Sequence, residues 1–130
     1  NKTGATWIIG IDTPINNMVS SKKIFSKTEL SNMALATSGN YRNFLEKNGK
    51  KITHSIDPRN GISVESNTLS VSVKARSCLV ADAWATALMI LPFDDGLRAV
   101  TEAGGLEALW IFSKGKEGLS RFSTKDFYRK

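Results

Sequence analysis

The chain has 130 residues, a net charge of +6, 41% hydrophobic residues and 23% charged residues. This length suits one domain with a sizeable core, and both shares are ordinary for a globular protein. No apolar run approaches the roughly 20 residues needed to cross a bilayer, so no transmembrane segment is predicted. The basic residues are scattered rather than gathered in blocks, which argues against a nucleic-acid-binding protein.

Cys78 is the only cysteine, which excludes an internal disulfide and a metal site made of cysteines. We expect it to be a small core residue at the start of a buried helix. The chain begins at Asn1, with no initiating Met and no secretion leader. We therefore expect it to be processed, truncated or split from a longer chain.

Strands are predicted in the first part of the chain. Residues 6–11 are rich in aromatic and β-branched side chains and end at the turn signal Asp12-Thr13-Pro14. Residues 18–25 and 30–37 are weaker strand candidates. The latter closes on Ser38-Gly39-Asn40-Tyr41, where short polar groups could hold a ligand at a strand end or form a plain turn.

A hairpin is predicted next, because Asn48-Gly49 is the strongest short hairpin signal in the chain. It would pair residues 41–47 with residues 51–56 and lead the sole histidine, His54, into Asp57-Pro58-Arg59-Asn60-Gly61. The proline and the closing glycine favour a stiff turn. Such a turn could present a base, an anchor and a phosphate partner together. The alternative is a structural histidine beside ordinary turn chemistry.

A strand and two helices are predicted in the second part of the chain. Residues 69–75 alternate apolar and polar side chains, which indicates a strand with one buried face. A helix follows and ends near Pro92. Asp94 or Asp95 is expected to cap a second helix, which stops at Gly104-Gly105.

The order of these elements predicts the fold class. Residues 109–113 and 119–122 are expected to form a closing hairpin. The whole order predicts an α+β fold, a mainly antiparallel sheet with two sequential helices packed on one face. Phosphate-loop and dinucleotide-binding fingerprints are absent from the sequence, which argues against the ordinary nucleotide-binding folds.

One charged side chain, Asp82, interrupts an otherwise apolar run over residues 79–93, which predicts a helix buried on nearly every face. A carboxylate in such surroundings needs a partner, because burying an unpaired charge is costly. Thr86 follows one turn later on the same face. The two could offer a carboxylate and a hydroxyl to a hard cation such as Mg²⁺, although this spacing alone indicates only a generic cation site.

Three stretches, in order along the chain, resemble motifs of the ApbE family of FAD:protein FMN transferases. Thr37-Ser38-Gly39-Asn40-Tyr41 looks like the family's Thr-Ser-Gly-x-Tyr. Residues 54–61 are similar to His-x-Ile-Asp-Pro-Arg-Thr-Gly, with Asn60 in place of the threonine, and residues 81–88 match Ala-Asp-Ala-x-x-Thr-Ala-Leu. The resemblance implies that residues 1–130 are the C-terminal half of an ApbE or T-fold-like domain. The N-terminal half, absent here, would supply the rest of the site.

The resemblance implies Mg²⁺-dependent transfer of FMN from FAD to a threonine hydroxyl of an acceptor protein, with release of AMP. It places Mg²⁺ on Asp82 and Thr86, with another ligand from the missing half. His54 would act as the general base or as a donor to the pyrophosphate, and Asp57 would orient His54 or brace its loop. The residues implied to contact the cofactor are Ser38, Asn40, Tyr41, His54 and Asp57.

The implied partners are FAD, an acceptor protein with a flavinylated threonine, and the missing half as a second fragment or chain. The family also implies a lipoprotein of the bacterial periplasm or cell envelope, attached to the membrane only through a lipid anchor on the missing part. Two alternatives stay open. One is a Mg²⁺-dependent FAD pyrophosphatase that yields FMN and AMP, and the other is a non-catalytic flavin-binding module.

Overall fold

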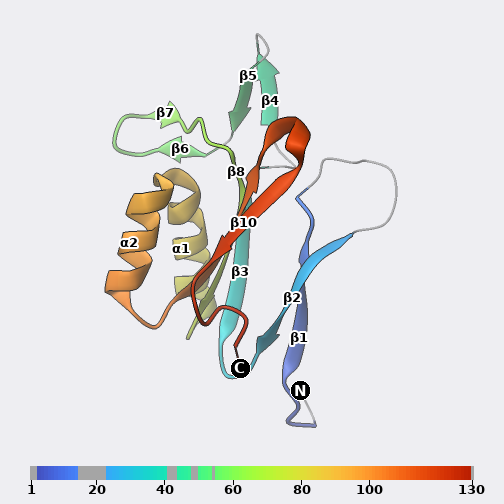
Figure 1. The fold of residues 1–130 in the computed structure, drawn as a ribbon. Coiled ribbons are helices and arrows are strands. Elements are labelled where there is room, and N and C mark those ends of the chain that lie inside the picture. The colour runs from blue at the N-terminus through green and yellow to red at the C-terminus, as the bar shows by residue number, and fades with distance from the viewer. Residues whose placement is uncertain (1–2, 15–22, 41–43, 48–49, 54, 130) are drawn as a thin grey trace.

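The computed structural model describes residues 3–14, 23–40, 44–47, 50–53 and 55–129 (Figure 1). Its elements follow the chain as β1 (Trp7–Asp12), β2 (Ile24–Leu30), β3 (Ala34–Gly39), β4 (Phe44–Lys47), β5 (Lys50–Thr53), β6 (Ile56–Asp57), β7 (Ile62–Ser63), β8 (Thr68–Ala75), α1 (Cys78–Ile90), α2 (Phe93–Ala103), β9 (Glu107–Ser113), the short 3₁₀ helix η1 (Gly115–Glu117) and β10 (Leu119–Ser123). No helix among these residues is long and apolar enough to cross a membrane.

A four-stranded antiparallel sheet with the order β10-β9-β8-β3 forms the centre of the molecule. The helices α1 and α2 pack on one face of this sheet (Figure 1). Alanine and leucine side chains of α1 meet valine side chains of β8 and the ring of Trp110 from β9. The structure therefore confirms the predicted α+β fold with two sequential helices on one face.

The β1–β2 hairpin lies beside the central sheet (Figure 1) and closes a second, smaller core. Ile11 of β1 packs there with Leu109 and Ile111 of β9 and with Phe127 near the C-terminus. Because this core covers the other face of the sheet, β8 is buried on both faces. Ser72 and Lys74 of β8 are only 1% and 2% exposed. The predicted strand with one buried face is therefore wrong in its burial, although its position is right.

The burial of α1 also differs from the prediction. The buried residues of α1 are Ala81, Ala85, Leu88 and Met89. Leu79 is 82% exposed, and Cys78 and Asp82 are also exposed. The predicted burial on nearly every face is wrong, because only the side of the helix that carries Ala81, Ala85, Leu88 and Met89 packs against the rest of the molecule, and Leu79 lies outside it. Cys78 is not a core residue, and the solvated carboxylate of Asp82 does not require a buried partner.

Several element boundaries were predicted well and others were not. β4 pairs with β5 so that Lys47 lies opposite Lys50, which confirms a hairpin around Asn48-Gly49, a dipeptide outside the described residues. The predicted return strand over residues 51–56 is too long, because β5 ends at Thr53 and Ile56 pairs with Ser63 of β7 in a separate sheet. The predicted closing hairpin is β9–β10. Residues 30–37 do not form one strand, because a turn separates β2 from β3 and Asn32 adopts a φ of 51° there. Of residues 18–25, only 23–25 are described, and β2 begins at Ile24.

α2 starts two or three residues earlier than predicted. Pro92 occupies the N-cap position, and no side chain in the described part of the chain caps the helix with a hydrogen bond. Asp94 and Asp95 lie inside the first turn, where a carboxylate interacts favourably with the positive end of the helix dipole. Gly104 ends the helix with a φ of 63°, as its sequence predicted.

Candidate functional site

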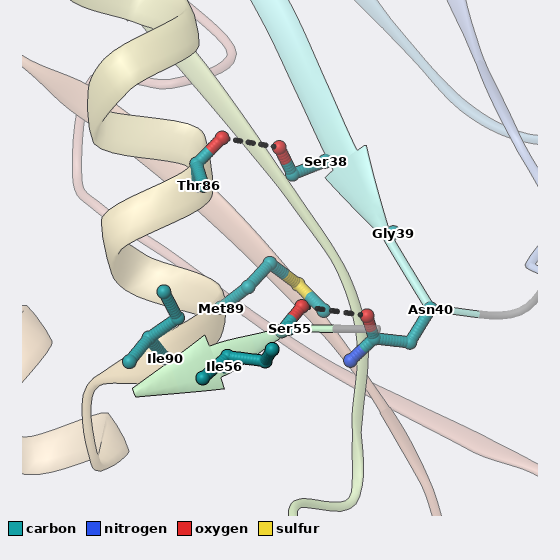
Figure 2. A pocket seen from close by; sticks show the side chains of 8 residues that line it. All are labelled: Ser38, Gly39, Asn40, Ser55, Ile56, Thr86, Met89 and Ile90. Atoms are coloured by element: carbon teal, nitrogen blue, oxygen red, sulfur yellow. Dashed lines mark hydrogen bonds between the residues drawn. The ribbon is translucent and has the colours of Figure 1, made fainter. Parts of the chain in front are cut away.

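A cavity of about 360 Å³ lies where the end of β3 meets α1 and β6 (Figure 2). We call it the β3–α1 cavity, and its lining residues are Ser38, Gly39, Asn40, Ser55, Ile56, Thr86, Met89 and Ile90. Its volume is at the lower end of the range for small-molecule sites, about 300–1,000 Å³. Four of the side chains carry oxygen and three are apolar, which suits one ring system with a polar edge.

Backbone pairing holds the β3 side of the cavity in place. Ser38 lies opposite Val71 in the antiparallel ladder between β3 and β8. The ladder continues past the end of the strand, because the backbone N–H of Asn40 donates to the carbonyl of Leu69 at 2.9 Å. The polar side chains at the end of β3 are therefore attached to the most buried strand of the fold.

The helix α1 supplies the opposite side of the cavity. Its N-terminus is capped by Ser77, whose hydroxyl accepts from the N–H of Val80 at 3.3 Å. Thr86 and Ile90 are four residues apart and therefore share a face of the helix, and Asp82 lies on that face one turn before Thr86. This face carries a carboxylate, then a hydroxyl, then an apolar side chain.

The hydroxyl groups of Thr86 and Ser38 meet across the cavity (Figure 2). Their oxygens are 3.1 Å apart, and either one can act as the donor. If Thr86 donates its proton to Ser38, the lone pairs of the Thr86 oxygen stay available to another group. Ser38 can therefore orient the hydroxyl that the sequence proposes as a metal ligand.

The donor chemistry of Asp82 and Thr86 fits Mg²⁺, because both offer hard oxygens and both side chains are exposed. Within the described residues there is no group of three or more His, Cys, Asp or Glu side chains that could hold a metal. Mg²⁺ prefers about six oxygen ligands in an octahedron. Asp82 and Thr86 offer the type of ligand atom that Mg²⁺ prefers. The remaining ligands would have to come from water, phosphate oxygens or another part of the protein.

The side chain of Asn40 is the most buried polar group of the cavity, at 6% exposure. Its carbonyl oxygen Oδ1 accepts a hydrogen bond from the Ser55 hydroxyl at 3.1 Å. Its amide nitrogen Nδ2 is buried and has no hydrogen-bond partner among the described residues. The cavity therefore contains an amide with an engaged oxygen and an unengaged nitrogen.

Asp57 lies outside the cavity lining and is 7% exposed. It accepts hydrogen bonds from the Arg59 side chain, at 2.6 Å from Nη2 and 2.9 Å from Nε, and from the Arg59 backbone N–H at 2.9 Å. The side-chain hydrogen bond from Arg59 is the main cause that lowers the pKa of Asp57 below its ordinary value. The pair braces the turn, which Gly61 closes with a φ of +72°.

The structure brings together some of the predicted site residues. Ser38, Asn40 and Thr86 line one cavity, Asp82 lies one turn away on α1, and Asp57 is engaged by Arg59. Tyr41 and His54 lie outside the described residues, so their roles stay predictions.

Sequence reasoning missed Ser55 and the apolar part of the cavity. Met89 and Ile90 follow Thr86 by three and four residues, so extending the helical face of Asp82 and Thr86 would have found them. Ser55 occupies a position that varies in the motif that it belongs to. No sequence signal connects it with Asn40.

All three stretches that resemble the family motifs contribute to the cavity lining. Ser38, Gly39 and Asn40 come from the first, Ser55 and Ile56 from the second, and Thr86 from the third. Residues 1–110 match the model of the ApbE family, and the chain belongs to this family.

Curated relatives and a solved structure agree with this assignment. The FAD:protein FMN transferase of Vibrio cholerae is 35% identical over 127 residues, which cover 98% of this chain and 36% of that protein. The Escherichia coli protein of the same name is 35% identical over 91% of this chain and 32% of its own length. The apo structure of the Pseudomonas stutzeri flavinyl transferase ApbE is 34% identical and superposes with a TM-score of 0.73, over 98% of this chain and 38% of that one. The chain therefore spans about a third of the length of these proteins, whereas the resemblance led us to expect about half.

Proposed function

We propose that this chain carries part of the site of an FAD:protein FMN transferase. The enzyme would move FMN from FAD to a threonine hydroxyl of an acceptor protein and release AMP. The observation that carries this proposal is the meeting of all three family-like stretches at the β3–α1 cavity. Proteins that are 35% identical to this chain bear the name of this activity, which supports the proposal.

The reaction is a displacement at phosphorus. The threonine oxygen forms a bond to the phosphorus of the FMN half, the bond from that phosphorus to the bridging oxygen breaks, and AMP leaves with the electron pair. The hydroxyl proton has to pass to a base, for which we propose His54, whose ordinary pKa of about 6.5 suits the task. Positioning and neutralisation of charge are expected to dominate catalysis.

The described residues in and beside the cavity would share this work. Asp82 and Thr86 would hold Mg²⁺, which would polarise the phosphoryl oxygens and neutralise the departing AMP. Ser38 would orient the hydroxyl of Thr86. The ion pair between Asp57 and Arg59 would keep the turn after His54 rigid. At about 360 Å³, the cavity suits one ring of FAD rather than the whole molecule, so the rest of FAD would contact other parts of the enzyme.

The test of this function uses the complete polypeptide that carries this chain, supplied with FAD, Mg²⁺ and an acceptor peptide containing threonine. We expect the peptide to gain the mass of one FMN unit by mass spectrometry, with one AMP released for each flavin attached. A peptide that stays unmodified, with FAD intact, would overturn the proposal. Glu102→Gln, an exposed change on α2, is the matched control for variants of Asp82.

The same assay separates the two alternatives. Rapid release of AMP in the absence of the peptide would favour a pyrophosphatase. Tight binding of FAD with neither hydrolysis nor transfer would favour a binding module. From the family resemblance alone, we further propose that the complete protein works in the bacterial periplasm or cell envelope behind a lipid anchor. Fractionation of cells that express it, with detection of the protein in the membrane fraction, tests this location.

A further inference from the structure

Asn40 and Ser55 are 15 residues apart in the chain, and their side chains meet at the β3–α1 cavity (Figure 2). Each residue is also held through its backbone. The N–H of Asn40 donates to the carbonyl of Leu69 at 2.9 Å, and the carbonyl of Ser55 accepts from the N–H of Val64 at 3.0 Å. The geometry between the two side chains is therefore set by backbone contacts on both sides.

Only one end of the Asn40 side-chain amide has a hydrogen-bond partner among the described residues. Its oxygen accepts from the Ser55 hydroxyl at 3.1 Å, while its buried nitrogen has no partner among the described residues. A buried amide nitrogen without an acceptor is costly, because it has lost its hydrogen bonds to water. In Figure 2 this nitrogen points toward the side of Ile56, another residue that lines the cavity. An acceptor that enters the cavity would satisfy it.

We propose that Ser55 is a positioning residue for ligand recognition, and that it acts through Asn40. The Ser55 hydroxyl engages the amide oxygen, so that the amide nitrogen is the group offered to the ligand. The ligand group would be an acceptor on the edge of a planar heterocycle. This proposal rests on the proposed function, because FAD has two such rings. The flavin carries carbonyl oxygens, and adenine carries unprotonated ring nitrogens.

The apolar lining of the cavity fits the face of such a ring. Met89 lines the cavity and is 2% exposed, and the flexible thioether of methionine adapts well to its surroundings. Ile56 also lines the cavity and is 55% exposed, which leaves apolar surface for a ring to cover. A planar ring could thus stack on these side chains while its edge accepts from Asn40.

The orientation of the amide matters because its two ends have similar shapes and opposite roles. Without the Ser55 hydroxyl, the amide can turn by half a rotation and present its oxygen to the ligand acceptor. Two acceptors facing each other repel, so part of the population would bind the ligand poorly. Loss of Ser55 should therefore weaken binding only when Asn40 is present.

A double-mutant cycle in the complete polypeptide tests this proposal, with FMN and AMP as separate probes. FMN binding is followed by flavin fluorescence, and AMP binding by calorimetry. For the probe whose ring occupies the cavity, Ser55→Ala should raise Kd about fivefold, the effect of one neutral hydrogen bond. In an Asn40→Ala background the same change should alter Kd less than about twofold. The probe that shows this pattern identifies which ring of FAD is bound.

Two further variants distinguish positioning from a structural role. Ser55→Thr keeps the hydroxyl and should restore most of the affinity, while Ser120→Ala, a half-buried serine on β10, is the matched control. Equal effects of Ser55→Ala in both backgrounds, or no effect on either probe, would overturn the proposal. The outcome is separable from that of the transfer assay. A positive cycle without transfer refutes only the proposed function, and transfer with a negative cycle refutes only the role of Ser55.

Discussion

The hydroxyl oxygens of Ser38 and Thr86 lie 3.1 Å apart and join the last residues of β3 to the third turn of α1. This contact connects two stretches of sequence that are 48 residues apart. Ser38 thus forms a hydrogen bond with the threonine that the family resemblance assigns to Mg²⁺. A group that forms a hydrogen bond with a metal ligand orients the lone pairs of that ligand toward the metal.

Ser38→Ala should weaken Mg²⁺ binding without removing it. Loss of a residue that orients a metal ligand typically costs about 10- to 100-fold in metal affinity. We expect the Mg²⁺ concentration for half-maximal flavin transfer to rise about tenfold, with near-normal activity at saturating Mg²⁺. The control is Ser31→Ala, in the exposed turn between β2 and β3. An unchanged Mg²⁺ dependence would mean that the contact with Thr86 is only structural.

Asp82→Asn should abolish Mg²⁺-dependent transfer and leave the fold intact. Asp82 is exposed, and an exposed substitution changes the free energy of unfolding by about 0.5 kcal/mol or less. Urea unfolding and the transfer assay together check both halves of this expectation. Full activity in the variant would remove Asp82 from the site, and a large loss of stability would show that its role is structural.

The Asp57–Arg59 pair should make stability depend on pH in the acid range. Arg59 lowers the folded-state pKa of Asp57 below its ordinary value of 3.8. The stabilisation is therefore fully present above the unfolded-state pKa and is lost as the pH falls through the lower, folded-state pKa. Below pH 4, acidification should lower the free energy of unfolding of the unmodified protein more than that of the Asp57→Asn variant. Urea unfolding curves of the two proteins that shift in parallel over this range would contradict the assignment.

Gly96→Ala should destabilise the packing of α2 against α1. A Cβ at this position would lie 3.0 Å from Cδ2 of Leu88, a side chain that is 1% exposed and has little room to move. Alanine favours a helix over glycine by about 1 kcal/mol, but overpacking a core costs about 1–3 kcal/mol. We expect a net loss of about 1 kcal/mol in thermal or urea unfolding.

The Leu88→Ala background provides the control for this prediction. Removing the Leu88 side chain removes the atom that the new methyl group would meet, so Gly96→Ala should then be neutral or stabilising. The same penalty in both backgrounds would show that the crowding does not come from Leu88.

Local chemistry explains which parts of the fold could be predicted from the sequence. The hairpin around Asn48-Gly49, the stop of α2 at Gly104 and the closing hairpin each depend on a few adjacent residues. Burial could not be predicted in the same way. Lys74 is 2% exposed because Phe127, distant in sequence, covers its face of the sheet. Leu79 is exposed because it lies outside the one face of α1 that packs in the core.

The same distinction between local chemistry and long-range contacts applies to the residues of the candidate site. The motif residues Ser38, Asn40 and Thr86 do gather at one cavity. Ser55 was missed because it meets Asn40 only after two separate backbone pairings have formed. Asp57 was expected to orient His54 or brace its loop, and the structure shows it engaged by Arg59, a partner only two residues away.

The face of α1 that carries Asp82, Thr86 and Ile90 has different chemistry at its two ends. Asp82 and Ile90 are eight positions apart, which corresponds to about 12 Å along the helix axis and is comparable with the length of a small ligand. Along that distance the helix surface changes from an anionic group, through a hydroxyl, to hydrocarbon. A ligand with a charged end and an aromatic end that lies along this face could bind in one orientation only. The polarity of a single helix would then select which end of the substrate reaches the reacting groups.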